Sequence, residues 1–290
     1  MKRVLIVING YGLAGGIQHQ VGRLKEEFSK RGVETEVIKN TQVFAYIFEG
    51  NIDISLPKYD FVLYLDKDRY VAELLEKAGY RLYNCIDSII KCDDKMLTHI
   101  CLANEGIKMP TTISSTLCYT DNGNRDYLVE VIDKIGLPMI IKENYGSLGK
   151  QVYLVNNHSE LLEIENKLIH IPHIFQQYIE CSKGKDYRIV VIGGEVVAYM
   201  KRENPYSYLS NLATGGTASK VELPQKYLDI AVRAAKILGL DYCGVDILEG
   251  PHGEPIVSEV NSNAFYEGIE KTTGINVAGC YADYLLNLNK

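Results

Sequence analysis

The segment GVDILEGPHGEPIVSEVNSN, residues 244–263, has the pattern of two apolar strands joined by a turn that contains Gly and Pro. This pattern is typical of an antiparallel hairpin, with the turn at residues 250–254. In such a hairpin, Asp246 lies nearly opposite Glu259. Asn261 shares the face of Glu259, because side chains two residues apart on a strand point to the same side. The segment therefore predicts three oxygen-bearing side chains close together in a mostly buried hairpin.

These three side chains predict a metal site. An unpaired buried carboxylate costs several kcal/mol, so two carboxylates and an amide in one apolar hairpin call for a compensating cation. Carboxylate oxygens combined with phosphate oxygens are the ligands that Mg²⁺ prefers. Asp246, Glu259 and Asn261 are accordingly the candidate metal ligands. The alternative is that Asp246 faces solvent or pairs with Arg188 or Arg202, which explains one acid more readily than three polar groups.

The composition is that of a soluble globular protein with room for two or three compact units. The chain has 290 residues, of which 46% are hydrophobic and 23% are charged. Its net charge of -6, without any long block of Lys or Arg, argues against a nucleic-acid surface or a polybasic membrane anchor. We therefore expect no nucleic-acid partner and no membrane partner.

The cysteines and the amino terminus indicate a cytoplasmic protein. Seven cysteines are scattered without a CxxC pair, which argues against a disulfide framework and a tetrahedral zinc site. The first apolar run ends at Ile8, too early for the core of a signal peptide. No run of about 18 apolar residues is present to span a membrane. We expect reduced cysteines that behave as small apolar residues.

Three successive patterns along the chain predict three structural units. Residues 1–92 alternate apolar strands with amphipathic helices, which predicts a parallel α/β domain. Residues 93–180 alternate helices and strands around a glycine-containing loop, which predicts a small α+β lobe. Residues 181–290 include two strands joined by Gly193-Gly194, a dipeptide suited to a tight hairpin, and the segment described above. They predict a second α+β lobe.

One helix at the first boundary is predicted in more detail. Asp93 and Asp94 are suited to open it, and Gly106 is suited to close it. Its helical spacing predicts an inward face formed by Met96, Leu97, Ile100 and Ala103.

The first of two glycine-rich segments resembles a dinucleotide fingerprint. Gly10, Gly12 and Gly15 spell GxGxxG after the first strand. The second strand, however, ends in Lys39-Asn40, with no acidic residue to hold a ribose hydroxyl. A turn that lets strand and helix pack is therefore favoured, although the start of a helix there could hold a substrate carboxylate.

The second glycine-rich segment is ENYGSLGK, residues 143–150, between two predicted strands. It lacks the residue pattern of a nucleotide-binding P-loop and of a nucleophile elbow. Its backbone N–H groups and the Ser147 hydroxyl can close over phosphates, with Lys142 entering from the preceding strand. An ordinary hairpin is the alternative, since Gly and Ser are common in turns.

Six blocks in a fixed order resemble the ATP-grasp ligases, and most of all their RimK-like group. The blocks are Lys142, GSLGK (146–150), FQQYIE (175–180), GKDYRIVVIGGEVVAYMKR (184–202), SNLATGGTAS (210–219), and GVDIL with EVNSN (244–263). The resemblance is strong from residue 94 to residue 274 and weaker before residue 90. It implies the ATP-grasp fold, in which an N-terminal parallel α/β domain precedes two α+β lobes that enclose the nucleotide.

The resemblance assigns most of these residues to a nucleotide site. Phosphate contacts would come from Lys95, Lys142 and the lid-loop residues Gly146, Ser147 and Gly149. Adenine would be read by a hinge formed by Gln177, Tyr178 and Ile179, and the site would be completed by Asp186 at the ribose, Ser210 and Asn211. Position 177 departs from the family, where Glu is common, although an amide can also hydrogen-bond a base edge.

The resemblance also implies the chemistry and the metals. Arg188, Arg202 and Asn211 would be catalytic, because a planar guanidinium suits both phosphate and the substrate carboxylate. The three hairpin side chains would bind two Mg²⁺ ions that bridge the phosphates, with Mn²⁺ as an alternative metal. ATP would phosphorylate a carboxylate to an acyl phosphate, which an amine then attacks. Alignment and charge neutralisation supply such catalysis without a nucleophilic side chain.

The expected activity is therefore that of an ADP-forming carboxylate-amine ligase. The resemblance implies that it joins an amino acid, such as glutamate, to a peptide, protein or small molecule. A nucleotide-binding regulatory module with the same fold is the alternative, and an NAD-dependent oxidoreductase ranks below both. Residues 203–209, with Tyr206 and Tyr208, and the loop at residues 11–16 are expected to shape substrate choice. A homo-oligomer is the general expectation for soluble enzymes that assemble.

Overall fold

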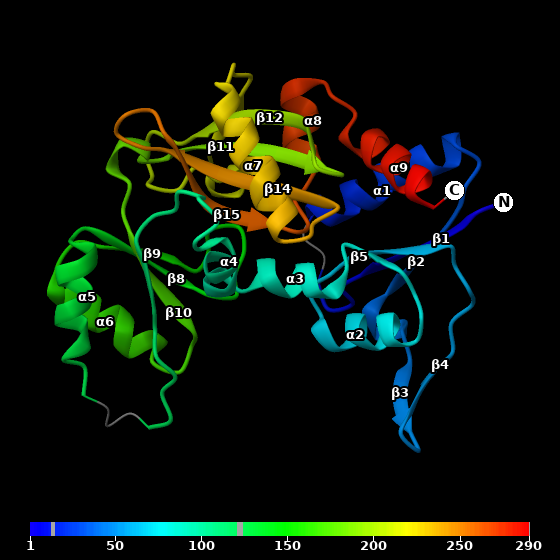
Figure 1. Cartoon of the computed structure of the whole chain (residues 1–290), viewed down its shortest axis with the longest axis horizontal. Coiled ribbons are helices and arrows are strands. Elements are labelled where there is room, and N and C mark those ends of the chain that lie inside the picture. The colour runs from blue at the N-terminus through cyan, green and yellow to red at the C-terminus, as the bar shows by residue number, and fades with distance from the viewer. Residues whose placement is uncertain (13–14, 121–123, 290) are drawn as a thin grey trace.

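The computed structural model describes residues 1–12, 15–120 and 124–289. These residues form three sheets of four or five strands and one separate hairpin (Figure 1). A parallel sheet precedes two antiparallel sheets along the chain, so the predicted combination of α/β and α+β architecture is confirmed. None of the helices in these ranges is long and apolar enough to cross a membrane.

The first sheet is parallel, with strand order β2-β1-β5-β6. Its elements are β1 (Arg3–Ile8), α1 (Gly15–Lys30), β2 (Glu34–Lys39), β5 (Phe61–Leu65), α2 (Arg69–Lys77), β6 (Leu82–Tyr83) and α3 (Ile86–Asp93). Helices cover both of its faces, with Leu24 and Phe28 of α1 on one side and Ala72 and Leu75 of α2 on the other. The strand order reverses between β1 and β5, so the loops after these two strands border one crevice.

A hairpin that the sequence did not predict separates β2 from β5. It consists of β3 (Ala45–Phe48) and β4 (Asn51–Ile54), which pair only with each other among the described residues. A short 3₁₀ turn at Asn40–Gln42 precedes it. Figure 1 shows the hairpin projecting from the first unit.

The second sheet is antiparallel, with strand order β7-β10-β8-β9. Its elements are β7 (Thr112–Ser114), α5 (Tyr127–Ile135), β8 (Met139–Glu143), β9 (Val152–Val155), α6 (His158–Leu168) and β10 (His173–Gln177). The two helices share a core with one face of the sheet, around the fully buried Phe175. Ile140, Lys142 and Gln176 on the strands line the cavity described below.

The third sheet is antiparallel, with strand order β13-β12-β11-β14-β15. Its strands are β11 (Lys185–Ile192), β12 (Glu195–Glu203), β13 (Thr217–Ser219), β14 (Tyr242–Glu249) and β15 (Pro255–Asn261), with 3₁₀ turns at Glu180–Ser182 and Leu212–Thr214. The helix α7 (Gln225–Ile237) covers one face, and α8 (Glu267–Thr273) and α9 (Val277–Leu288) cover the other. Gly193 and Gly194 have φ of 58° and 81° in the tight turn from β11 to β12. The hairpin predicted there is confirmed.

The inward face predicted for the helix after Asp94 is wrong. Asp94 caps α4 (Lys95–Leu102) as predicted, because its carboxylate accepts from the backbone N–H of Met96 and Leu97, but Asp93 belongs to α3. The buried residues of α4 are Lys95, Thr98, His99 and Leu102, whereas Ile100 and Ala103 are exposed. The physical reason is that three of these buried residues are polar: Lys95 lines the cavity, Thr98 donates to the carbonyl oxygen of Lys91, and His99 contacts Gln176. Apolar spacing therefore misplaces the inward face.

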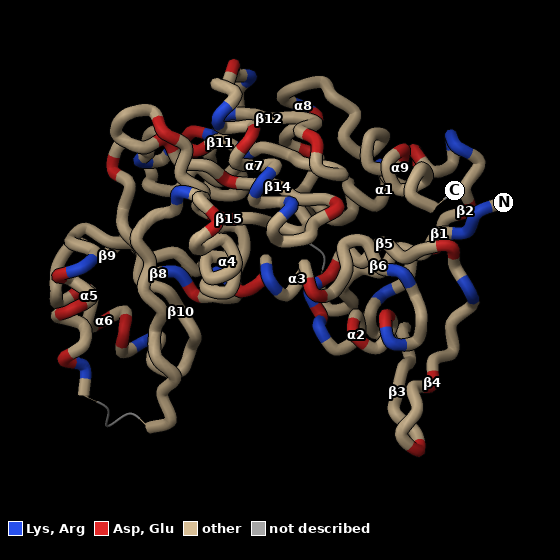
Figure 2. The backbone as a smooth tube through the Cα atoms, viewed as in Figure 1, with Lys and Arg blue, Asp and Glu red and all other residues tan. Residues whose placement is uncertain are grey.

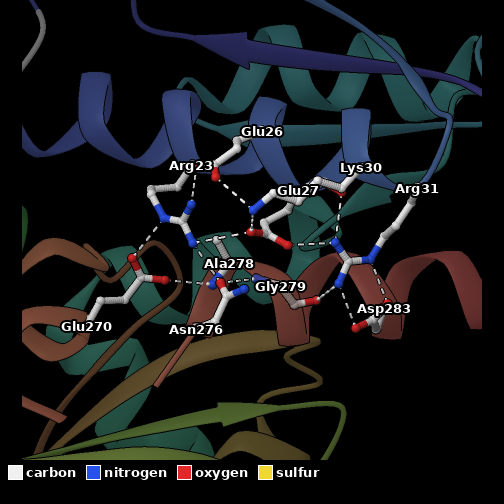
Figure 3. Close-up of polar contacts among 10 residues, drawn as sticks. All are labelled: Arg23, Glu26, Glu27, Lys30, Arg31, Glu270, Asn276, Ala278, Gly279 and Asp283. Carbon is white, nitrogen blue, oxygen red and sulfur yellow. Dashed lines mark hydrogen bonds and ion pairs between the residues drawn. The ribbon is translucent and has the colours of Figure 1, made fainter. Parts of the chain in front are cut away.

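The C-terminal helices pack back onto the first unit through an ionic network (Figure 3). Glu27 on α1 is buried, and its carboxylate accepts hydrogen bonds from Lys30 at 2.9 Å and Arg31 at 2.7 Å. Arg31 reaches Asp283 on α9 at 2.6 Å, and Arg23 reaches Glu270 on α8 at 3.1 Å. Residues of α8 and α9 therefore share a core with residues of β1 and α1. The boundaries near residues 92 and 180 stay predictions.

Candidate active site

A cavity of about 800 Å³ lies between the second and third sheets and reaches the loops after β1 and β5. All the residues that the sequence predicted for nucleotide binding, metal binding or catalysis line it. They are Lys95, Lys142, Gly146, Ser147, Gly149, Gln177, Tyr178, Ile179, Asp186, Arg188, Arg202, Ser210, Asn211, Asp246, Glu259 and Asn261. The structure thus brings the predicted set together from both lobes, and the role of each residue stays a prediction.

The β14–β15 hairpin positions the candidate metal ligands. Asp246 pairs with Glu259 across the two strands, as predicted, between buried neighbours such as Val245 and Val260. The register then shifts, and Ile247 pairs with Val257, which leaves Ser258 without a partner across the ladder. Ser258 lines the cavity, and its hydroxyl lies 3.3 Å from Nζ of Lys142. The irregularity therefore links the hairpin of the candidate metal ligands to Lys142, the candidate phosphate contact.

Asp246 is paired with two arginines, as the alternative interpretation allowed. Nη2 of Arg188 donates to Oδ2 of Asp246 at 2.8 Å, Nε of Arg188 donates to Oδ1, and Nη2 of Arg202 lies 3.0 Å from Oδ2. Burial on its own would raise the pKa of the Asp246 carboxyl, but the two guanidinium groups hold that pKa below its ordinary value. Asp246 is therefore an anion that is held in place before any ligand enters.

Arg202 also holds Asp186. Its Nε donates to Oδ1 of Asp186 at 2.7 Å and its Nη2 to Oδ2 at 2.5 Å, while the Ser210 hydroxyl donates to Oδ2 at 2.7 Å. The oxygens of Asp186 are thus largely occupied by protein donors, so a ribose contact would have to use its remaining acceptor capacity.

Glu259 and Asn261 are open to a metal in a way that Asp246 is not. Among the described residues Glu259 forms no ion pair within 4.0 Å, and Nδ2 of Asn261 is buried without a hydrogen-bond partner. Half a turn of the Asn261 amide would present its oxygen instead. In these ranges no group of three or more His, Cys, Asp or Glu could hold a metal alone. Two carboxylates and an amide fit Mg²⁺ that is held partly by phosphate oxygens.

The two lysines that the sequence predicted for this cavity have different surroundings. Desolvation lowers the pKa of the Lys142 ammonium from 10.5 to about 8, although Glu259 favours the charged form. Nζ of Lys95 donates to the carbonyl oxygens of Asn144 at 3.4 Å and Gly146 at 3.2 Å. Lys95 therefore contacts the start of the lid loop, residues 146–150.

The lid loop lies against the loop that follows β12. Leu148 and Gly149 have positive φ of 60° and 76°, and a Cβ added at Gly149 would lie 3.2 Å from Oδ1 of Asn211. The hydroxyl of Tyr208 donates to the carbonyl oxygen of Val152 at 2.9 Å, just after the lid. Tyr206, by contrast, is 96% exposed and does not line the cavity. Only one of the two tyrosines predicted to shape substrate choice therefore borders the site.

A buried residue that sequence reasoning missed lies directly before the hinge, on β10. Gln176 lines the cavity, and its Nε2 lies 3.0 Å from both Nε2 of His99 and Oγ1 of Thr112. Burial lowers the pKa of His99 to about 4, so its neutral ring accepts this hydrogen bond. The side-chain oxygen of Gln177 instead accepts from Thr111 at 3.3 Å. Strand alternation was the available signal, because consecutive residues of a strand point to opposite faces. Phe175 faces the core, so Gln176 faces the cavity.

The first unit contributes a polar wall that the sequence did not predict. The backbone N–H of Gly10 donates to Oδ1 of the buried Asn40 at 2.9 Å, and Nδ2 of Asn40 donates to Oδ2 of Asp66 at 2.7 Å. Asn9 donates to the same carboxylate at 3.2 Å, and both Asn9 and Asp66 line the cavity. Asp66 directly follows β5, at the carboxyl end of a parallel strand next to β1. Ligand-binding residues are common at this position in such sheets, and this position was the available signal. Residues 13 and 14 of the glycine loop lie outside the described residues.

Comparisons with known proteins agree with this geometry. A family model described as a RimK-like ATP-grasp domain matches residues 92–285. N-acetylaspartylglutamate synthase A of Homo sapiens is 31% identical over 283 residues, which cover 91% of this chain and 71% of the synthase. A probable alpha-L-glutamate ligase of Legionella pneumophila (strain Corby) is 34% identical over 278 residues, which cover 91% of this chain and 90% of that ligase. The chain spans 57% of the length of beta-citrylglutamate synthase B of Homo sapiens, with 33% identity over 225 residues, or 77% of this chain.

Solved structures share the fold. The ATP-grasp ligase PsnB, complexed with a phosphomimetic variant of its minimal precursor, Mg and ADP, has a TM-score of 0.71 and 19% identity, and the match covers 100% of this chain and 99% of that chain. D-alanine–D-alanine ligase from Bacillus anthracis, complexed with ATP, has a TM-score of 0.71 and 20% identity, and the match covers 99% of this chain and 96% of that chain. On the evidence of the family model and the curated relatives, this chain belongs to the RimK-like ATP-grasp family.

Proposed function

We propose that this chain is an ATP- and Mg²⁺-dependent carboxylate-amine ligase that releases ADP and phosphate. The observation that carries the proposal is the single cavity in which cations and oxygen ligands from two lobes converge. The cations are Lys95, Lys142, Arg188 and Arg202, and the oxygen ligands are Asp246, Glu259 and Asn261. A triphosphate needs both kinds of group at once, because its charge must be neutralised by cations and by metal.

The nucleotide would lie between the second and third sheets. The hinge residues Gln177, Tyr178 and Ile179 lie at the end of the cavity formed by β10, which suits the base. Lys142 lies 3.3 Å from Ser258 of the β14–β15 hairpin, and the lid-loop residues Gly146, Ser147 and Gly149 line the same cavity, which suits the phosphates. Mg²⁺ would neutralise charge on the phosphates and would be held by the three hairpin side chains; we propose two ions, with Mn²⁺ able to replace them.

The chemistry would proceed in two steps. A carboxylate oxygen of the substrate attacks the γ-phosphorus of ATP, and the bond to the β-phosphate oxygen breaks to release ADP. The amine nitrogen then attacks the acyl carbon, phosphate leaves, and the nitrogen gives up a proton to solvent. Arg188, Arg202 and Asn211 would orient the carboxylate and the transferred phosphoryl group. The lid loop would exclude water from the acyl phosphate.

The names of the relatives support glutamate as one substrate. The synthase and the ligases similar to this chain are named for glutamate or for compounds that contain it. We propose that the chain adds glutamate, or a closely similar amino acid, to a carboxylate-bearing small molecule, peptide or protein. The carboxylate-bearing substrate would be bordered by the polar wall of the first unit at Asp66 and by the loop around Tyr208.

Phosphate release from ATP with Mg²⁺ tests the proposal. The ligase proposal expects release to rise when glutamate and a pool of small carboxylic acids and peptides are supplied, with ADP as the nucleotide product. A Glu259→Gln variant is the matched control, because it removes a proposed metal ligand and Glu259 forms no ion pair with the described residues. No stimulation by broad pools would favour the regulatory module instead. Formation of AMP would exclude the proposed mechanism.

A further inference from the structure

The β3–β4 hairpin carries an exposed apolar surface that the proposed function does not use. The hairpin patch consists of Phe44, Tyr46, Ile47 and Phe48 together with Tyr70 of α2. Glu49 and Gly50 have φ of 48° and 78°, as in a two-residue turn, so the two strands end in a tight tip. None of the patch residues lines the cavity.

The patch is large for the surface of a monomer. Phe44 is 71% exposed, Ile47 70%, Phe48 60% and Tyr70 76%. With about 200 Å² for a fully exposed large side chain, the patch leaves roughly 600 Å² of apolar surface in water. That is the upper end of the range for monomers, and about three quarters of the roughly 800 Å² that each partner contributes to a standard interface. The area suits a partner of moderate size or a second copy.

Apolar side chains lie on both faces of the hairpin, and Tyr46 and Phe48 share their face with Asp53 and Asn51, their partners on β4. Ile47 pairs across the strands with Ile52, and these two residues border a groove that Tyr70 also lines. Tyr46 and Phe48 point to the opposite face, where the rings of Phe44 and Tyr46 lie 5.5 Å apart between centroids. A two-stranded hairpin with one exposed aromatic face is marginally stable alone and gains from added strands.

The free edge of β3 lacks the usual protection. Exposed edge strands normally carry a charge or a proline that prevents pairing with another chain. Strand β4 carries Asp53, whereas β3, with the sequence AYIF, carries no charge. In Figure 2 the backbone tube of β3 is tan, whereas the tip of the hairpin is red, the colour of acidic residues. The unprotected edge is therefore the edge of β3.

We propose that β3 of one copy pairs antiparallel with β3 of a second copy across a two-fold axis, giving a homodimer with a four-stranded sheet. A second copy fits because an antiparallel strand that pairs with itself presents the same apolar sequence on both sides of the axis. The pairing satisfies the free backbone groups of both edges and joins the two aromatic faces into one. The chain alone therefore supplies a partner that matches the patch in area, polarity and backbone pattern.

Sedimentation velocity on the full chain tests this proposal. The wild type should sediment as a species of twice 32.6 kDa, and the Phe44→Ser/Phe48→Ser double variant should sediment as a monomer. Ile47→Lys, which places a charge on the free edge, should also give a monomer. Because these side chains are exposed, the variants should keep the melting temperature of a folded monomer. Leu117→Ser/Tyr119→Ser, which changes two exposed apolar residues elsewhere, is the matched control and should stay dimeric.

Three results would overturn the proposal. A wild-type chain that stays monomeric at the highest soluble concentration would remove the dimer itself. A dimer that survives both hairpin variants would place the interface elsewhere. A control variant that dissociates as the hairpin variants do would mean that general surface polarity, and not β3, sets the association.

Discussion

Arg202 bridges two carboxylates from neighbouring strands, because its guanidinium lies 3.0 Å from Oδ2 of Asp246 and also donates to Asp186 at 2.7 Å. Burial would lower the pKa of Arg202, but Asp246 and Asp186 raise it, so the arginine stays charged. Asp246, a candidate metal ligand, is therefore oriented by cations of the same cavity. Carboxylates held in this way need little rearrangement when a metal and a nucleotide arrive.

The two proposed metal carboxylates should respond differently to removal of their charge. Glu259→Gln should lower kcat/KM by about 100-fold or more, because one charge at the transferring phosphates is lost. Its free energy of unfolding should change by less than about 0.5 kcal/mol, since Glu259 has no ion pair to break in the described structure. Asp246→Asn should cost a similar factor in kcat/KM and also of the order of 3 kcal/mol of stability, since it leaves buried guanidinium charge behind.

Steady-state kinetics and urea denaturation measure the two effects. Equal losses of stability in both variants would contradict the distinction between a free and a paired carboxylate. Full activity of Glu259→Gln would contradict the metal assignment.

Lys142 should take up a proton when ATP binds above pH 8. Its pKa of about 8 lies below the ordinary 10.5, so the ammonium loses its proton as the pH rises through 8, whereas bound phosphates favour the charged form. The affinity for ATP should therefore fall by up to about tenfold for each pH unit above 8. Without ATP the sign is opposite: the unfolded chain binds more protons between pH 8 and 10.5, so this group makes the fold more stable as the pH rises through that window.

Calorimetry in two buffers of different ionisation enthalpy measures the proton uptake. Lys142→Met should abolish it, and Lys150→Met, a change in the exposed end of the lid loop, should keep it. Uptake that persists in Lys142→Met would assign the proton to another group.

Tyr208 should couple lid closure to product formation. Tyr208→Phe removes one hydrogen bond to the carbonyl oxygen of Val152, worth about 1 kcal/mol, and so should let water reach the acyl phosphate more often. The ratio of phosphate released to amide formed should rise by up to about fivefold. Tyr206→Phe, in the same loop but exposed, should leave the ratio unchanged. If both variants keep the wild-type ratio, the contact does not seal the cavity.

Glu27 should make the fold sensitive to acid. Burial on its own would raise the pKa of the Glu27 carboxyl, but hydrogen bonds from Arg31 and Lys30 lower it to about 2. Since the ordinary value is 4.5, the stabilisation is fully present above pH 4.5 and is lost as the pH falls toward 2. Glu27→Gln should therefore lower the free energy of unfolding at pH 7 by about 3 kcal/mol.

Urea denaturation at pH 7 and pH 3 measures this effect, with Glu26→Gln as the control from the exposed side of the same network. The difference between wild type and Glu27→Gln should shrink at the lower pH. A constant difference would mean that the packing of α1 on α9, and not the charge, carries the effect.

The polar chemistry of the site was predictable from the sequence because the chemistry itself selects the residue types. Asp246, Glu259 and Asn261 stand out as oxygen-bearing side chains in an apolar hairpin, and this signal is visible without any knowledge of the fold; the structure places all three in one cavity, and their role as metal ligands stays a prediction. The blocks that resemble ATP-grasp ligases add the order of the elements. Fold class, family and ligase class were predicted in this way and are confirmed.

What the sequence did not predict, or left as one of two alternatives, depends on contacts between distant segments. The inward face of α4 is wrong because helical periodicity assumes an apolar neighbour, whereas Lys95 faces a polar cavity. The pairing of Asp246 with Arg188 or Arg202 stayed an alternative at the level of the sequence, because it depends on strand order and β11 and β12 precede β14 by many residues. Gln176 and Asp66 were missed because each looks like an ordinary strand-end residue until the sheets are placed around one cavity.

Transfer of a carboxylate oxygen to phosphate tests the central claim most directly. The chain is supplied with ATP, Mg²⁺, glutamate and small carboxylic acids whose carboxyl oxygens carry a heavy isotope, and the released phosphate is analysed by mass spectrometry. The acyl-phosphate mechanism predicts one heavy oxygen in each phosphate that accompanies an amide product. Amide formation with unlabelled phosphate, or with AMP and diphosphate, would contradict it.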